Sequence, residues 1–238
     1  MNNAITAITG STPNLVVLTG NKKKRYHTNG NGCNGTVDPI RSKNDVERIK
    51  EYFLSNKRQG LRNYAIWTMG INVGLRAGDL LSIKTYQVYQ NGQVVDRFRI
   101  YEQKTKKYRM IVLNDSAKEA IGLYLDSLAH IDADSYLFHS QKGNGQTQLR
   151  RDTLTHIMKD AQRDLELKEN VGTHSMRKTF AYNAYRNAYA QVKENPEATM
   201  KALPLLMQTL NHSSEAMTLK YMGLLQEDMD NLYNGLNL

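Results

Sequence analysis

Near the end of the chain, the stretch LNHSSEAMTLKYMG sets a histidine, two serines and a tyrosine at short spacing. His212 precedes Tyr221 by nine residues, and Ser213 and Ser214 between them favour the first position of a helix. A tyrosine hydroxyl becomes a nucleophile only when a base or positive surroundings help it lose its proton, because a free phenol has a pKa of about 10. The spacing therefore predicts a short helix that carries a candidate nucleophile after a histidine.

A second histidine lies close to an arginine in the stretch GTHSMRKTF. Thr173 is a candidate N-cap, and the three-residue spacing puts His174 and Arg177 on one helix face, beside the free N–H groups of the helix start. That arrangement suits a phosphate. Taken alone, the pair fits a surface salt bridge better, so its meaning depends on the residues that surround it in the folded chain.

A further arginine, Arg76, stands between an apolar segment and the apolar residues of DLLSI. An arginine held between two buried segments has a fixed position, and its planar guanidinium can bind two non-bridging oxygens of a phosphodiester. A structural ion pair with Asp79, three residues later, explains Arg76 equally well.

The composition favours a polyanionic partner. Among 238 residues there are 32 Lys and Arg against 23 Asp and Glu, a net charge of +9, which indicates nucleic acid before a merely soluble basic protein. The single cysteine, Cys33, excludes an internal disulfide and a cysteine-rich zinc site, and it fits a reducing cytoplasm. The first residues, MNNAITAITG, lack the pattern of a signal peptide, and no apolar run approaches a membrane span. We expect a soluble cytoplasmic protein without a membrane partner.

The elements that must position these residues begin after a distinct first segment. Residues 1–36 hold a basic run, NKKKRYH, and a glycine- and asparagine-rich run, which predict a tail or linker. From VDPIRSKNDVERIKEYF onward, apolar residues recur at helical spacing after a candidate cap at Ser42. The sequence therefore predicts one packed domain over residues 37–238.

Helices dominate the pattern within that domain. NYAIWTMGINVGL is apolar nearly all round, so it predicts a buried central helix that ends near Gly74. YQVYQNGQVVDRFRIYEQKTKKYRMIVL holds three β-like runs, with turns at Asn91–Gly92 and Thr105–Lys107. Two apolar stripes then predict further helices: Ala117, Ala120, Ile121, Tyr124, Leu125 and Leu128, and then Leu154, Ile157, Met158, Ala161 and Leu165. The expected fold class is α+β, mainly α, with one small three-stranded antiparallel sheet.

In this order, GLRAGDLL, HSMR and LNHSSEAMTLKY resemble the three signature boxes of the tyrosine recombinases, the phage integrase class, and the resemblance covers about residues 37 to 238. It implies a mainly helical catalytic domain with a small three-stranded sheet, which breaks and rejoins DNA strands at specific sites. Asn211 stands where the family usually has glycine before the histidine. Full integrases also carry an N-terminal helical DNA clamp, and residues 1–36 are too short and too rich in glycine to form one, so we expect that clamp to be absent from this chain.

The resemblance also implies a role for each box residue. Arg76, His174 and Arg177 would surround the scissile phosphate, and His212 would hydrogen-bond to it or pack against it. Tyr221 would be the nucleophile, which forms a 3′-phosphotyrosyl bond. On this reading we expect replacement of Arg177 by alanine to cost much more reaction rate than stability.

The remaining chemical roles follow from the same resemblance. A lysine in the β-hairpin turn would be the general acid; Lys104 is the best candidate, with Lys106 and Lys107 close enough to remain alternatives. His174, with an ordinary pKa of about 6.5, would be the base. No metal or other cofactor is expected, because the cationic side chains would neutralise the charge of the transition state.

The implied partners are double-stranded DNA, further copies of the chain in a recombination tetramer, and accessory DNA-bending proteins. Leu224, Leu225, Met229 and Leu232, at near-helical spacing, would dock on their own domain or on a neighbouring protomer. Two other functions remain open. A type IB topoisomerase uses nearly the same residues, and a non-catalytic relative would bind DNA without forming a covalent adduct.

Overall fold

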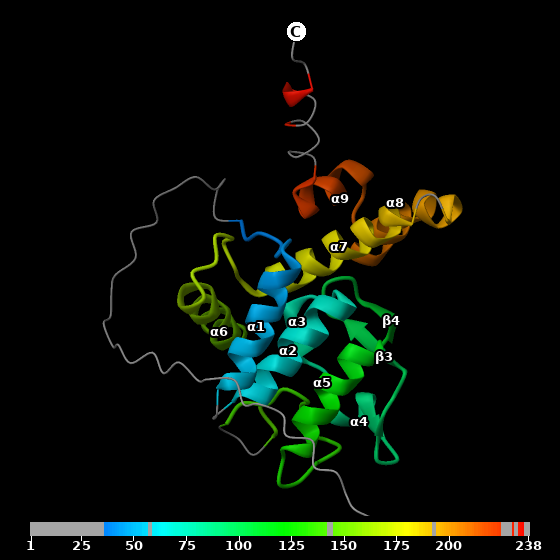
Figure 1. Cartoon of the computed structure of the whole chain (residues 1–238). Helices are drawn as coiled ribbons and strands as arrows, with labels where there is room; N and C mark the ends of the chain where they lie inside the picture. Colours follow the sequence, from blue (N-terminus) through cyan, green and yellow to red (C-terminus); the bar gives the residue numbers. More distant parts are fainter. Residues whose placement is uncertain are drawn as a thin grey trace, which may run out of the picture. The chain divides into compact units, whose positions relative to one another are not determined.

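The computed structural model describes residues 36–56, 59–141, 145–191, 194–224, 230 and 233–235, and Figure 1 shows them as a mainly helical arrangement. The predicted tail, apart from Thr36, lies outside these residues, as do Leu225, Met229 and Leu232. The helices are α1 (Lys43–Ser55), α2 (Gly60–Val73), α3 (Ala77–Leu81), α4 (Thr85–Val88), α5 (Asp115–Asp126), α6 (Arg151–Asp164), α7 (Thr173–Ala190), α8 (Pro196–Leu210) and α9 (Glu215–Met222). The strands are β1 (Tyr89–Gln90), β2 (Gln93–Val94), β3 (Arg97–Glu102) and β4 (Lys107–Val112). No helix in the described residues combines the length and the apolar character needed to cross a bilayer.

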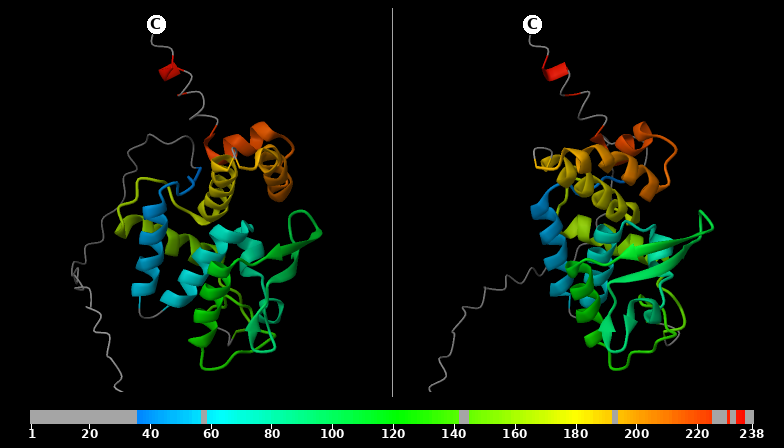
Figure 2. Two further views of the ribbon diagram at one scale, coloured as in Figure 1. Left: turned by 45° about the vertical axis from the view of Figure 1, so that its right-hand side comes forward. Right: turned by 90° about the vertical axis from the view of Figure 1, so that its right-hand side faces the viewer.

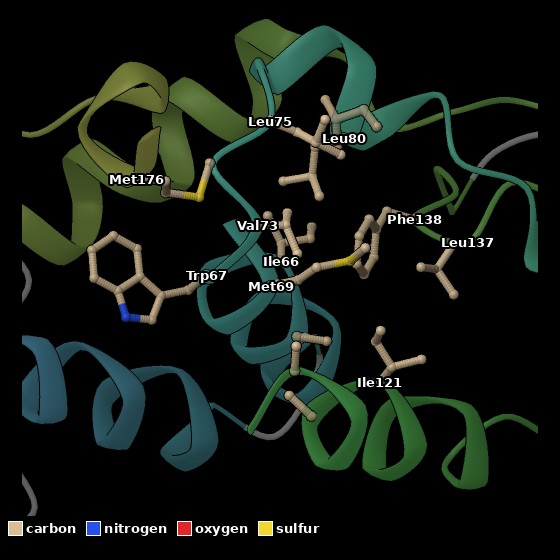
Figure 3. Packing of buried hydrophobic residues seen from close by; sticks show 14 of the residues in the cluster. Ile66, Trp67, Met69, Val73, Leu75, Leu80, Ile121, Leu137, Phe138 and Met176 are labelled. Atoms are coloured by element: carbon tan, nitrogen blue, oxygen red, sulfur yellow. The ribbon is translucent and has the colours of Figure 1, made fainter. Parts of the chain in front are cut away.

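The predicted central helix is α2, and it is buried almost throughout its length. It contacts α1, α5 and α7, and Figure 3 shows its side chains packed among residues of α5, α7 and other segments. Ile66, Trp67 and Met69 are fully buried, and each large apolar side chain of this kind contributes about 1.5–3 kcal/mol on burial. The helix ends where Gly74 adopts a left-handed φ of 62° and its N–H bonds to the Gly70 carbonyl, as predicted.

Local sequence signals set the ends and the inner faces of the surrounding helices. The Ser42 hydroxyl accepts a hydrogen bond from the Asp45 N–H (3.2 Å) and caps α1, as predicted. The two apolar stripes are also confirmed, because most of their residues are buried and the others pack against the same core. The buried ones are Ala117, Ala120, Ile121, Tyr124, Leu125, Leu154, Met158 and Ala161.

The prediction of one three-stranded sheet is wrong in its strand pairing. The described residues form two separate antiparallel ladders, β1 with β2 and β3 with β4. The middle β-like run bends at Asp96, so its first part pairs backward with β1 and its second part pairs forward with β4. The bend keeps the three runs from sharing one sheet, while the mainly helical α+β class holds.

A second group of helices, α7, α8 and α9, carries its own small core. Ala181, Leu206, Leu210 and Met222 are buried there, and Leu224 packs with them. Figure 2 shows these helices, in yellow to orange, together on one side of the helices that pack around α2. The β3–β4 hairpin, in green, projects outward from the helices around α2. Helix α7 belongs to both groups because it also contacts α2 and α6. The boundary between the two groups is where the sequence-predicted site residues lie.

Candidate active site

Helix α7 presents His174 and Arg177, but its cap differs from the prediction. Gly172 is the N-cap and Thr173 is already the first helical residue, so the prediction of a Thr173 cap is wrong. A Cβ at Gly172 would lie 2.8 Å from Cγ1 of Val37, so a larger residue here would require one of the two segments to shift. The Ser175 hydroxyl accepts a hydrogen bond from the Gly172 N–H (3.1 Å) and closes the first turn. His174 lies in this first turn with its residue surface exposed, and Arg177 follows three residues later.

Arg177 points inward and ties two distant turns together. Arg177 is only 3% exposed. Nη1 donates to the Gly74 carbonyl (2.6 Å) and Nη2 donates to the Leu210 carbonyl (3.0 Å). Burial lowers the pKa of Arg177 to about 10, and the neighbouring arginines add to that effect. The first and third signature boxes therefore meet at one guanidinium.

Arg76 lies directly before α3 and faces two buried carboxylates. Nη1 of Arg76 is 3.9 Å from Oδ2 of Asp79 and 3.6 Å from Oε1 of Glu102. The ion pair with Asp79 that the spacing suggested is therefore present. These separations exceed those of hydrogen bonds, and within the described residues Nη1 is buried without a hydrogen-bond partner. The two carboxylates therefore hold Arg76 in place by charge.

Lys104 lies in the turn between β3 and β4, and this turn is fastened to the same carboxylates. The Gln103 N–H donates to Oδ1 of Asp79 (3.0 Å), and the Thr105 hydroxyl donates to Oε2 of Glu102 (2.9 Å). Lys104 itself is exposed, and its charge is among those that lower the pKa of His212. The turn thus holds an exposed ammonium group at the edge of the arginine cluster.

The turn after α8 places His212, and Asn211 makes that turn possible. Asn211 has a left-handed φ of 53°, its N–H bonds to the Gln208 carbonyl, and the His212 N–H bonds to the Met207 carbonyl (2.9 Å). Asparagine visits this backbone region more readily than other residues with a Cβ. It can therefore serve where the resemblance led us to expect glycine.

His212 and Tyr221 lie side by side, and the predicted short helix, α9, carries the tyrosine. The Ser214 hydroxyl caps α9 by accepting from the Met217 N–H (3.2 Å). Nδ1 of His212 is 3.1 Å from the Thr218 hydroxyl, and the His212 ring stands edge-on to the Tyr221 ring with centroids 5.0 Å apart. One turn of α9 thus orients the imidazole against the phenol.

Burial shifts the pKa of the phenol and of the two imidazoles in opposite directions, whereas the neighbouring arginines lower all three. Burial raises the pKa of Tyr221, while the positive charges of Arg177 and Arg76 oppose that rise. Desolvation by the surrounding protein, with the same two arginines, lowers the pKa of His174 and of His212. Both imidazoles are therefore neutral at pH 7, and either can accept a proton.

All six residues predicted for the site gather at one place. Arg76 is close enough for its charge to lower the pKa of each of four other site residues: His174, Arg177, His212 and Tyr221. Lys104 is close enough to lower the pKa of His212. Glu102 and Arg109 were not predicted as part of the site. The alternation in RFRIYE, in which Phe98 and Ile100 are buried, gives a signal for Glu102, because it puts this carboxylate on the same inner face.

The chain matches the model of the family described as "Phage integrase family" over residues 41–227. It is 31% identical over 188 residues to a probable integrase/recombinase, YoeC, of Bacillus subtilis (strain 168), with 79% of this chain and 90% of that protein covered. The chain belongs to the phage integrase family, the tyrosine recombinases, as the three boxes suggested.

Solved structures of recombinases share the fold. XerA recombinase matches with a TM-score of 0.60 at 22% identity, and the match covers 87% of this chain and 66% of that one. XerH recombinase bound to a palindromic difH substrate matches with a TM-score of 0.57 at 20% identity, covering 80% of this chain and 51% of that one. The Tn1549 transposon integrase in complex with a circular intermediate DNA gives 0.56 at 18%, covering 84% and 67%. This chain thus spans about half to two thirds of these structures.

Proposed function

We propose that this chain cleaves and rejoins DNA strands at specific sites through a 3′-phosphotyrosyl intermediate formed on Tyr221. The observation that carries the proposal is the contact of Tyr221 with His212 within the field of Arg76 and Arg177. A phenol in that position can attack a phosphate that the same two guanidinium groups bind. The domain that performs this reaction would be residues 37–238.

In the proposed first step, the Tyr221 oxygen attacks a backbone phosphorus and the bond to the 5′-oxygen breaks. Arg76 and Arg177 stabilise the added charge of the pentavalent transition state, and His212 binds or packs against the same phosphate. His174, neutral because its pKa is lowered, accepts the phenolic proton. Lys104 protonates the departing 5′-oxygen.

The second step reverses the first with a different strand. The phosphotyrosyl bond conserves the energy of the phosphodiester, so a 5′-hydroxyl from another duplex can attack it and release Tyr221. The partners in this proposal are double-stranded DNA, a tetramer of identical chains on that DNA, and accessory DNA-bending proteins. The net charge of +9 supports a DNA partner, and the proposed location is the cytoplasm.

A covalent-adduct assay tests the proposal. Protein, negatively supercoiled plasmid and excess EDTA are incubated, quenched with SDS and examined for protein attached to nicked DNA. We expect an adduct from the wild type, none from Tyr221→Phe, and equal DNA binding by both, since the variant loses only a hydroxyl. Tyr86→Phe is the matched control, because Tyr86 is 51% exposed on α4 and lies outside the site.

Each outcome of that assay decides between functions. An adduct that persists in Tyr221→Phe would contradict the assigned nucleophile. DNA binding by the wild type without any adduct would favour the non-catalytic reading. Joining of two different duplexes, measured on the same plasmid with a second labelled duplex, separates recombination from the relaxation that a type IB topoisomerase performs.

A further inference from the structure

The inner face of the β3–β4 hairpin carries Glu102 and Arg109, of opposite charge, beside buried apolar side chains. Glu102 pairs with Lys107 in the strand register and Arg109 pairs with Ile100, so Glu102 and Arg109 are diagonal neighbours on one face. That face also holds Phe98 and Ile111, which are buried. Charged side chains in such a place need partners, because leaving them unpaired costs several kcal/mol.

Glu102 meets two arginines and the hairpin turn at once. Its Oε1 is 3.6 Å from Nη1 of Arg76 and 3.5 Å from Nη1 of Arg109. Its Oε2 accepts from the Thr105 hydroxyl, and its backbone carbonyl accepts from the Lys106 N–H (2.9 Å). One carboxylate thus connects the turn that carries Lys104 to the arginine that follows α2.

Arg109 extends this connection to the other end of the site. Its Nη1 donates to the Thr209 carbonyl (3.0 Å) in the last turn of α8, a hundred residues away in the sequence. The next carbonyl, that of Leu210, accepts from Arg177, and the turn that places His212 follows directly. The charges of Glu102 and Arg109 also act on the pKa of Arg177.

We propose that Glu102 and Arg109 form a brace that holds the Lys104 turn, Arg76 and the His212 turn in one arrangement, and that both are positioning residues for DNA cleavage. This inference rests on the proposed function. A buried ion pair adds little stability compared with apolar residues of the same shape, so the brace acts on geometry more than on the free energy of unfolding. Misplacement of a reacting group by about 1 Å can cost about 100-fold in rate.

Amide hydrogen exchange tests the brace without DNA. The two reporters are the Gln103 N–H, bonded to Asp79, and the His212 N–H, bonded to Met207. In Glu102→Gln and Arg109→Gln we expect both amides to exchange about tenfold faster relative to the amides of α2, whose own change reports the general loss of stability from leaving one charge unpaired. The matched control is Arg97→Gln, which removes a charge from the exposed face of the same hairpin and leaves both reporters unchanged.

A cleavage measurement on the same proteins tests the positioning role. With plasmid in excess, we expect Glu102→Gln and Arg109→Gln to form the adduct about 100-fold more slowly than the wild type, with the Kd for DNA within about threefold, a difference below 1 kcal/mol. Arg97→Gln should keep the wild-type rate of adduct formation.

The two readouts separate failure of the brace from failure of the proposed function. The brace is overturned if exchange in the two variants becomes faster at the Gln103 amide alone, or if it becomes faster by the same factor at the α2 amides. It is also overturned if Glu102→Gln and Arg109→Gln form the adduct as fast as Arg97→Gln does. If the wild type forms no adduct, the proposed function fails, and the exchange result still decides whether the hairpin and the His212 turn are coupled.

Discussion

Replacement of Arg177 by alanine separates the structural and the chemical parts of one side chain. The guanidinium donates charge-assisted hydrogen bonds to the carbonyls of Gly74 and Leu210, at 2.6 and 3.0 Å. At about 1.5–3 kcal/mol each, these bonds contribute roughly 3–6 kcal/mol. Against them, burial lowers the pKa of Arg177 to about 10, an opposing cost of about 3 kcal/mol. The net loss of stability in Arg177→Ala should be about 0–3 kcal/mol.

The expected loss of rate is larger than that loss of stability. Removing one donor to the charge that develops in a transition state costs about 10²–10³-fold, or roughly 3–4 kcal/mol. The unfolding midpoint of Arg177→Ala, measured by circular dichroism, should fall by up to about 10 °C. Adduct formation, measured well below that midpoint and per folded molecule, should fall by the full 10²–10³-fold.

Arg62→Ala is the matched control, because Arg62 is also buried, at 7% exposure, and lies outside the site. It donates to Oδ1 of Asn63 (3.0 and 3.2 Å) and to the His139 carbonyl. This variant should lose stability but keep its rate per folded molecule. The reasoning would be refuted by an Arg177→Ala protein that keeps the wild-type rate, or by one that does not fold at all while Arg62→Ala folds.

Three further outcomes are expected. Because the pKa of His174 is lowered, the imidazole takes up a proton only at pH below its ordinary 6.5; the rate of adduct formation should be flat near pH 7 and fall in that acid range, and a fall that begins above pH 7 would exclude His174 as the base. In urea unfolding, the free energy of unfolding of Asn211→Gly should lie within about 0.5 kcal/mol of the wild-type value, and that of Asn211→Val should be about 1–2 kcal/mol lower, because valine tolerates φ near 53° poorly. Equal stability of the two variants would contradict the role given to that turn. Lys104→Met should slow adduct formation by about 10²–10⁴-fold, with far smaller effects from Lys106→Met and Lys107→Met, and a comparable loss at either of these would move the general acid there.

Elements with strong local signals could be predicted from the sequence. The apolar run of α2, the Ser42 cap of α1 and the glycine at position 74 each specify a structure through neighbours within a few residues. The step from His212 to Tyr221 is of the same kind, since Ser214 caps the helix between them. Helix faces and turns follow from such short-range patterns.

The features that could not be predicted depend on contacts between distant segments. Gly172 is the cap of α7, and a Cβ there would crowd Val37, which is 135 positions away in the sequence. The division of the sheet at Asp96 depends on the strands with which the two parts of the run pair, so the composition of the run does not reveal it. The carbonyl partners of Arg177 lie 103 and 33 residues away, so no local pattern reveals them.

The choice of arginine at position 177 follows from the helix ends that meet there. The carbonyl groups at the end of a helix lack partners within it and carry partial negative charge, and Arg177 binds one such group after α2 and another in α8. A guanidinium has five N–H donors in a planar fork, so two bonds to carbonyls leave donors free for a phosphate. A lysine ammonium has three donors on a flexible stem and could not hold both turns in fixed directions while binding a third acceptor. The same side chain can therefore assemble the site and act in it, which is why its loss should affect stability and rate to different extents.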